Sequence, residues 1–133
     1  MAESLIEYRK IGLLATCIGN ERIRIDTDGG LYFSRNSREC LPGEIWSEDW
    51  RLVRRLDIAA VDKLVQDIKD SGVLELPPTM VDEEYEGGRR EELMVVVDTV
   101  THRYLVQDTD HPEFKVAVRS LWGILAFYGG DIL

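Results

Sequence analysis

The chain of 133 residues has few cysteines, few histidines and no excess of basic side chains, and each shortage argues against a class of protein. Two cysteines without CxxC spacing do not form a disulfide scaffold, so we predict reduced cysteines and a cytoplasmic protein. The net charge of −9 argues against binding to nucleic acid or anionic membranes, because such binding depends on lysine and arginine. No stretch approaches the ~20 apolar residues that a membrane-spanning helix needs.

The chain is long enough, and apolar enough, to build one core. Hydrophobic residues make up 44% and charged residues 31%, which predicts a single domain over residues 1–133 that folds without a structural metal. The acidic excess lies in the second half, where residues 57–133 carry sixteen acidic and seven basic side chains. Much of it falls within residues 82–92, a run typical of a solvated loop.

The first half of the chain reads as a series of strands. Residues 11–18 are apolar at odd and even positions alike, which favours a strand covered on both faces. Residues 36–44 contain Pro42 and Gly43 and indicate a loop. Residues 50–56 lack a helical stripe, and we predict a further strand there.

The segment 21–35 carries the clearest hairpin signal, around Asp28-Gly29-Gly30. A two-residue turn would mix polar with apolar side chains on one face, whereas a three-residue loop over 27–29, with Gly29 at positive φ, keeps apolar residues together. We predict the second register. It pairs Ile25 with Leu31 and Ile23 with Phe33, and it leaves Arg22, Arg24 and Tyr32 on the other face.

Two segments have helical periodicity. The first begins after Asp57, a suitable N-cap, and ends near Gly72, which can adopt the left-handed conformation. Its apolar stripe consists of Ile58, Val61, Leu64, Val65 and Ile68. The second is predicted to begin with Asp110 as N-cap and Pro112 in the first turn. Its stripe consists of Phe114, Val118, Leu121, Leu125 and Tyr128.

Between the two helices, residues 93–100 and 101–108 are rich in valine and predict a pair of strands. With a turn over 99–101, the expected pairs are Val96 with Tyr104, Met94 with Val106 and Asp98 with His102. The order of elements is therefore β-β-β-β-α-β-β-α. We predict the α+β class, with a mainly antiparallel sheet of about five to six strands and both helices packed on one face.

Candidate catalytic or metal-binding groups are scarce. His102 and His111, with Asp108 and Asp110, could form a small-ligand or metal site, or serve an enzyme. Their spacing matches neither a calcium loop nor a zinc pair, and no serine or cysteine lies in a nucleophile motif. We therefore predict a non-enzymatic protein without a cofactor or metal, and keep the four-residue site as the alternative.

Arginine, tyrosine and tryptophan dominate the energetics of protein interfaces, and the first half of the chain is rich in them. We predict a partner-binding surface, and the expected partner is another protein or a second copy of the chain. The proposed contact residues are Arg22, Arg24, Tyr32, Trp46 and Trp50, with Arg51, Arg54 and Arg55 as further candidates on the same surface.

Several short motifs also follow one another in a familiar order. They are Ile23-Arg24-Ile25-Asp26-Thr27-Asp28-Gly29-Gly30, a helix leading into Leu74-Glu75-Leu76-Pro77, paired strands, and Asp110 and Pro112 before Leu121 and Leu125. In this order the chain resembles the emfourin-like (protealysin-inhibitor-like) family of small α+β proteins. Members of that family include inhibitors of thermolysin-like metalloproteases, so the resemblance implies a protease as partner. It assigns no inhibitory residue in this chain.

Overall fold

The computed structural model describes residues 2–13, 16–84 and 88–130. Seven strands form one sheet, and two α-helices and a short 3-10 helix complete the fold. The elements are β1 (Ser4–Gly12), β2 (Glu21–Asp26), β3 (Gly30–Arg35), β4 (Arg51–Arg55), α1 (Ile58–Asp70), η1 (Val73–Glu75), β5 (Thr79–Val81), β6 (Arg89–Val97), β7 (Val100–Gln107) and α2 (Pro112–Gly129).

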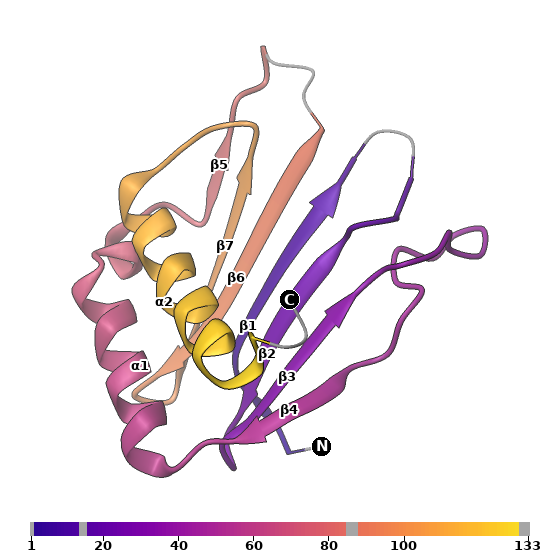
Figure 1. The fold of residues 1–133 in the computed structure, drawn as a ribbon. Helices are drawn as coiled ribbons and strands as arrows, with labels where there is room; N and C mark the ends of the chain where they lie inside the picture. Colours follow the sequence, from indigo (N-terminus) through magenta and orange to yellow (C-terminus); the bar gives the residue numbers. More distant parts are fainter. Residues whose placement is uncertain (1, 14–15, 85–87, 131–133) are drawn as a thin grey trace.

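The strands lie in the order β4-β3-β2-β1-β6-β7-β5. All neighbours are antiparallel except β5 and β7, which are parallel. Both α-helices cover the same face of the sheet (Figure 1). The predicted α+β class is confirmed, and the sheet has one strand more than the largest number expected. The extra strand is β5, whose three residues are too few to show a strand period.

The first strand lies earlier in the chain than predicted. β1 ends at Gly12, and in the part of 11–18 that the structure describes, residues 13 and 16–18 form a connection, so the predicted strand is wrong there. Residues 14 and 15 lie outside the described residues. β1 instead buries Ile6 and Tyr8 against the helices while Glu7 and Arg9 face away, the alternation of a strand covered on one side.

The first hairpin has the predicted register. Ile25 lies opposite Leu31 and Ile23 opposite Phe33. Gly29 has a φ of +90°, and a Cβ at this position would lie 2.4 Å from the carbonyl oxygen of Leu56. The loop therefore needs glycine both for its backbone conformation and for the close approach of the chain that follows β4.

The second hairpin differs from the predicted register. Leu93 pairs with Tyr104 and Val95 with His102, through a two-residue turn at Asp98 and Thr99. Both turn residues have positive φ, 51° and 67°, which fits the tight turns that match the twist of a hairpin. This register brings the odd-numbered apolar residues of β6 into the core, and the pairs expected for Val96, Met94 and Asp98 do not form.

Each helix buries one stripe against the sheet in a single hydrophobic core. The Asp57 side chain accepts a hydrogen bond from the Ala60 N–H at 2.8 Å, and Gly72 has a φ of +84°, as predicted for the two ends of α1. Ile58 departs from its stripe, with 79% of its surface exposed. The N-cap of α2 is His111 and not the predicted Asp110, and the Asp110 carboxylate forms ion pairs with Arg89 and Lys115.

The acidic run over 82–92 is only partly a loop. β6 begins at Arg89, so the last residues of the run belong to the sheet, and residues 85–87 lie outside the described residues. Within β6, Arg89 pairs with Glu91 at 3.0 Å and Arg90 lies 3.7 Å from Glu92. Within 2–13, 16–84 and 88–130, no helix has the length and apolar character to cross a membrane.

Candidate functional site

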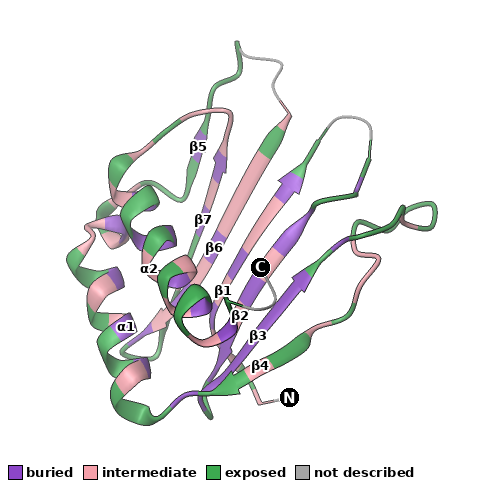
Figure 2. Ribbon diagram, in the orientation of Figure 1, coloured by how far each residue is buried: buried purple, intermediate pink, exposed green. Residues whose placement is uncertain are grey.

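The face of the sheet opposite the helices is polar and arginine-rich. It carries the even-numbered residues of β2 and the odd-numbered residues of β1, because directly paired residues share a face. Charged side chains here form ion pairs within their own strands, such as Arg9 with Glu7 at 2.6 Å. Figure 2 shows β4 as the most exposed strand at one edge of this sheet.

Arg22 is the centre of an aromatic cluster on this face. Its guanidinium carbon lies 4.3 Å from the ring centroid of Trp46 and 4.3 Å from that of Trp50, so the cation is held between two indoles. Its Nη2 also donates to the carbonyl oxygen of Glu48 at 3.0 Å. We call Arg22, Trp46 and Trp50 the Arg–Trp cluster. The two tryptophans are half-buried, and their remaining ring surface faces solvent.

The connection between β3 and β4 is held in place by buried polar groups. Asn36, with 2% of its surface exposed, donates from Nδ2 to the carbonyl oxygens of Cys17 and Ile45 and accepts from the Ser47 N–H. Ser34 Oγ donates to the Glu48 carbonyl oxygen at 3.0 Å. These contacts fix the segment that carries Trp46 and Trp50, so the cluster is formed without a partner.

A disulfide ties the same connection to the segment after β1. Cys17 and Cys40 are bonded, at a sequence separation of 23. The prediction of two reduced cysteines is therefore wrong for this structure. The cause is long-range: the end of β1 and the connection after β3 meet at one end of the sheet, and no local pattern announces that meeting.

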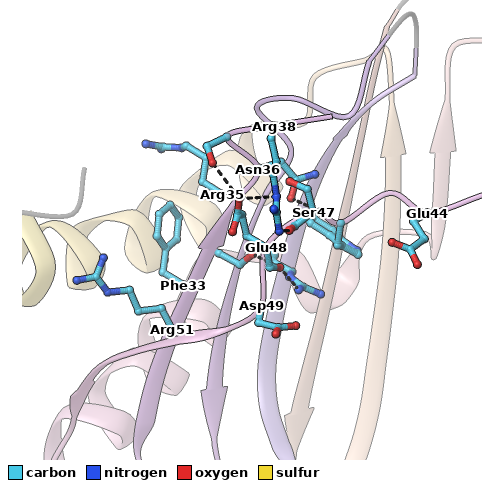
Figure 3. A pocket seen from close by; sticks show the side chains of 13 residues that line it. Phe33, Arg35, Asn36, Arg38, Glu44, Ser47, Glu48, Asp49 and Arg51 are labelled. Carbon is cyan, nitrogen blue, oxygen red and sulfur yellow. Dashed lines mark hydrogen bonds and ion pairs between the residues drawn. The ribbon is translucent and has the colours of Figure 1, made fainter. Parts of the chain in front are cut away.

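A wide hollow adjoins the cluster, with Arg22 and Trp46 in its lining. It has a volume of about 810 Å³ and is open to solvent. In Figure 3, Phe33 and Arg51 lie at one end and Glu44 at the other. Its lining is mainly charged and polar, and the Glu48 carboxylate accepts a hydrogen bond from the Ser37 hydroxyl and lies 3.4 Å from Arg38. The hollow offers recognition of polar groups and lacks the apolar walls typical of small-molecule sites.

Electrostatics at the cluster follow from burial. Partial burial lowers the pKa of Arg22, with the neighbouring charge of Arg9 as a second cause, although guanidinium groups stay protonated in proteins. Near the disulfide, a hydrogen bond from the Thr16 hydroxyl holds the pKa of Glu39 below its ordinary value. Glu39 thus stays a carboxylate that accepts from the Thr16 hydroxyl and the Cys17 N–H.

Two of the predicted contact residues lie outside the cluster. Arg24 donates to the Asp26 carboxylate and to the carbonyl oxygen of Ala2, so its guanidinium serves the chain itself. Tyr32 has only 8% of its surface exposed and packs over Gly30, where a Cβ would approach its ring at 2.7 Å. Arg22, Trp46 and Trp50 come together, and Arg24 and Tyr32 do not join them.

The arginines of β4 also lie elsewhere. Arg51 pairs with Phe33 and Arg54 with Leu31, so both side chains are on the helix side of the sheet. The Arg54 guanidinium carbon lies 5.1 Å from the ring centroid of Tyr128, and Arg55 pairs with Asp28 at 3.1 Å. The expectation that Arg51 and Arg54 extend the surface of Arg22 is therefore wrong, because their pairing with β3 turns them to the other side.

The four residues of the alternative site are divided between the two ends of β7. His102 lies near its beginning, whereas Asp108, Asp110 and His111 follow its end, about 20 Å away at the rise of an extended strand. Among the residues that the structure describes, no group of three or more His, Cys, Asp or Glu side chains could hold a metal ion. The alternative has no geometric support.

Sequence reasoning missed Asn36 and Glu48 as the groups that position the tryptophans. A polar residue in a loop carries no signal of its burial, and Glu48 acts largely through its backbone carbonyl, which any residue supplies. The even number of cysteines was the one usable signal for the Cys17–Cys40 bond. A scan against protein-family models and a search of curated proteins found no match to this chain.

Proposed function

We propose that this chain is a non-enzymatic protein-binding module that uses the Arg–Trp cluster as its contact. The observation that carries the proposal is the position of the Arg22 guanidinium, 4.3 Å from both indole centroids. Tryptophan and arginine are the residues most enriched among those that dominate interface energies. Holding them in place before binding removes part of the entropy cost of association.

The surroundings of the cluster favour a protein partner over a small molecule. The adjoining hollow is wide, open and charged, a character closer to the polar rim of an interface than to a ligand pocket. The half-buried tryptophans supply an apolar centre, which this charged rim borders. A partner that covers the cluster would bury both indoles while the charged rim stays hydrated.

The resemblance to the emfourin-like family supplies the first partner to test, a thermolysin-like metalloprotease. The measurement is turnover of a fluorogenic peptide by such a protease with increasing amounts of the chain. We expect turnover to fall, and Trp46→Ala with Trp50→Ala to weaken this inhibition by about tenfold or more, the size of effect of truncated interface tryptophans. Trp122→Phe, in the core, is the control variant.

A second copy of the chain is the other candidate partner, and sedimentation velocity over a range of concentrations tests it. Self-association that disappears in the Trp46→Ala, Trp50→Ala variant would support a dimer through the cluster. Unchanged turnover together with a monomer at all concentrations would contradict the proposal for both partners.

The compartment forms part of the proposal. A cytoplasmic location, expected from the sequence, would require the Cys17–Cys40 bond of the structure to be reduced in the cell, because thiol systems keep most cytosolic cysteines reduced. Alkylation during lysis of the native cells, followed by mass spectrometry, measures this directly. Two alkylated cysteines are expected for a cytoplasmic protein, and an unmodified pair would contradict that location.

A further inference from the structure

The outer edge of β4 is a second surface with the properties of a binding site. β4 is the first strand in the sheet order and pairs only with β3, so its other edge presents unpaired backbone N–H and C=O groups. Neither helix covers that edge in Figure 1. Four of its five residues are exposed, and the fifth, Val53, is half-buried.

The edge is basic in a chain that is acidic overall. Three of the five residues of β4 are arginines, against a net charge of −9 for the whole protein. Arg51 forms no ion pair with any described residue, and Arg54 stacks on a tyrosine ring. Both side chains of the Arg55–Asp28 ion pair are exposed to solvent, so the pair neutralises the charge of the strand only weakly.

The side chains of β4 divide between the two sides of the sheet in a way that specifies a partner strand, although the register shift opposite Leu31 and Tyr32 breaks their strict alternation. Arg51 and Arg54 face the helix side, because they pair with Phe33 and Leu31. Leu52 faces the other side with 46% of its surface exposed. A strand added to this edge would place its own side chains beside these, since directly paired residues share a face. Carboxylates suit the arginine side, and an apolar residue suits the side of Leu52.

The same charges argue against a second copy as the occupant. A two-fold pairing of β4 with β4 would bring three arginines of each copy together along a five-residue edge, and like charges close to one another across a pair of strands destabilise it. Arginine side chains favour a partner that carries carboxylates, because their paired N–H donors match the two carboxylate oxygens and lysine offers no such pair.

We propose that the outer edge of β4 adds an extended segment of another protein that alternates acidic and apolar residues. Backbone hydrogen bonds of the added strand would supply affinity, and Arg51, Arg54 and Leu52 would supply selectivity. This surface differs from the Arg–Trp cluster, so the failure of either proposal leaves the other standing.

The test uses a seven-residue peptide of alternating glutamate and valine, added to the full chain labelled with ¹⁵N. We expect amide shifts over residues 51–55 and slower hydrogen exchange of amides in β4, because a new strand protects N–H groups that faced water. A lysine–valine peptide and a glutamate–valine peptide with a central proline are the matched controls, and neither should slow that exchange.

Substitutions of the β4 arginines test whether these side chains give the edge its preference for acidic peptides. Arg51→Glu with Arg54→Glu is expected to weaken binding of the acidic peptide by about tenfold or more. Arg103→Glu with Arg119→Glu makes the same change in net charge at two exposed positions of β7 and α2 and should leave binding unchanged. Equal binding of the lysine peptide, unchanged exchange over 51–55, or no binding of the acidic peptide at millimolar concentration would each overturn the proposal.

Discussion

At the scale of single residues, Gly29 carries two separate structural demands. Its φ of +90° disfavours any other residue, and a Cβ would collide with the Leu56 carbonyl oxygen at 2.4 Å. The Gly29 carbonyl oxygen also accepts from the Leu56 N–H at 2.8 Å, so the clash cannot be relieved without loss of that hydrogen bond. This one glycine therefore couples the first hairpin to the start of α1.

We expect Gly29→Ala to lower the free energy of unfolding by about 3 kcal/mol or more, as the sum of a left-handed backbone and a displaced contact. Gly19→Ala is the control, because Gly19 has a φ of +87° with no atom within 4 Å of the added Cβ. It should cost about 1–2 kcal/mol. Urea denaturation measures both, and equal losses would mean that the contact with Leu56 contributes nothing.

Tyr8 links stability to alkaline pH. Burial raises its pKa, and the hydrogen bond from its hydroxyl to the Glu91 carboxylate at 2.8 Å adds to the rise. The folded state thus holds the neutral phenol, whereas the unfolded chain releases the proton near pH 10. Stability from this group is complete below pH 10 and is lost as pH rises further.

We expect Tyr8→Phe to be less stable at pH 7 by about 1–2 kcal/mol, because a hydrogen bond to a carboxylate is lost. Above pH 10 its stability should fall less steeply than that of the unmodified chain. Some slope should remain, since burial also raises the pKa of Tyr104. Urea denaturation at pH 7, 9 and 10.5 compares the two chains, and parallel losses above pH 9 would contradict this role of Tyr8.

At the scale of elements, the connection between β3 and β4 has no regular structure of its own and depends on the Cys17–Cys40 bond and on Asn36. A bond closing a loop of this length stabilises a fold by about 3 kcal/mol through the unfolded state. Removal of the bond should affect this segment first, because the bond joins Cys40 of the connection directly to the segment after β1.

We expect Cys17→Ser with Cys40→Ser to lower the free energy of unfolding by about 3 kcal/mol and to speed hydrogen exchange most in residues 36–50. Amides of α1, in the core, should change only with global stability. The unmodified chain with and without reductant is the matching comparison. An exchange pattern that changes evenly over the whole chain would mean that the bond does not hold the connection specifically.

The elements that could be predicted are those with strong local rules. The first hairpin follows from the apolar pairing of Ile23 and Ile25 and from Gly29, and α1 from its stripe and its Asp57 cap. The second hairpin could not be placed, because Asp98 and Thr99 adopt positive φ without a glycine to signal it. β5 is three residues long and exists through its pairing with β7.

The contact residues, like the elements, were predicted from the sequence only in part. Composition singled out arginine and tryptophan, and the hairpin register placed Arg22 and Arg24 on one face. The choice between them depends on where the connection crosses the sheet. The connection passes over the start of β2 and the end of β3, near Ser34 and beside Arg22, whereas Arg24 lies toward the N-terminal segment at Ala2.

At the scale of the molecule, both helices and the sheet share one hydrophobic core. Trp122 of α2 contacts Tyr8 of β1 and Phe33 of β3, with ring centroids 6.3 and 6.1 Å apart. No element can lose its place without exposing apolar surface of the others, which favours cooperative unfolding of the described part as one unit. The Arg–Trp cluster lies outside this core, on the other side of the sheet.

The three tryptophans therefore report on two different regions, and variants can separate them. With Trp46→Phe and Trp50→Phe, fluorescence reports the core through Trp122, and its urea midpoint should coincide with that of far-UV circular dichroism. With Trp122→Phe, fluorescence reports the connection through Trp46 and Trp50. The urea midpoint of this fluorescence should match that of circular dichroism while the disulfide is intact. After reduction it should fall below that of circular dichroism, because the reduced connection can detach while the core remains folded. Coincident midpoints after reduction would show that the core and the connection unfold together whether or not Cys17 is bonded to Cys40.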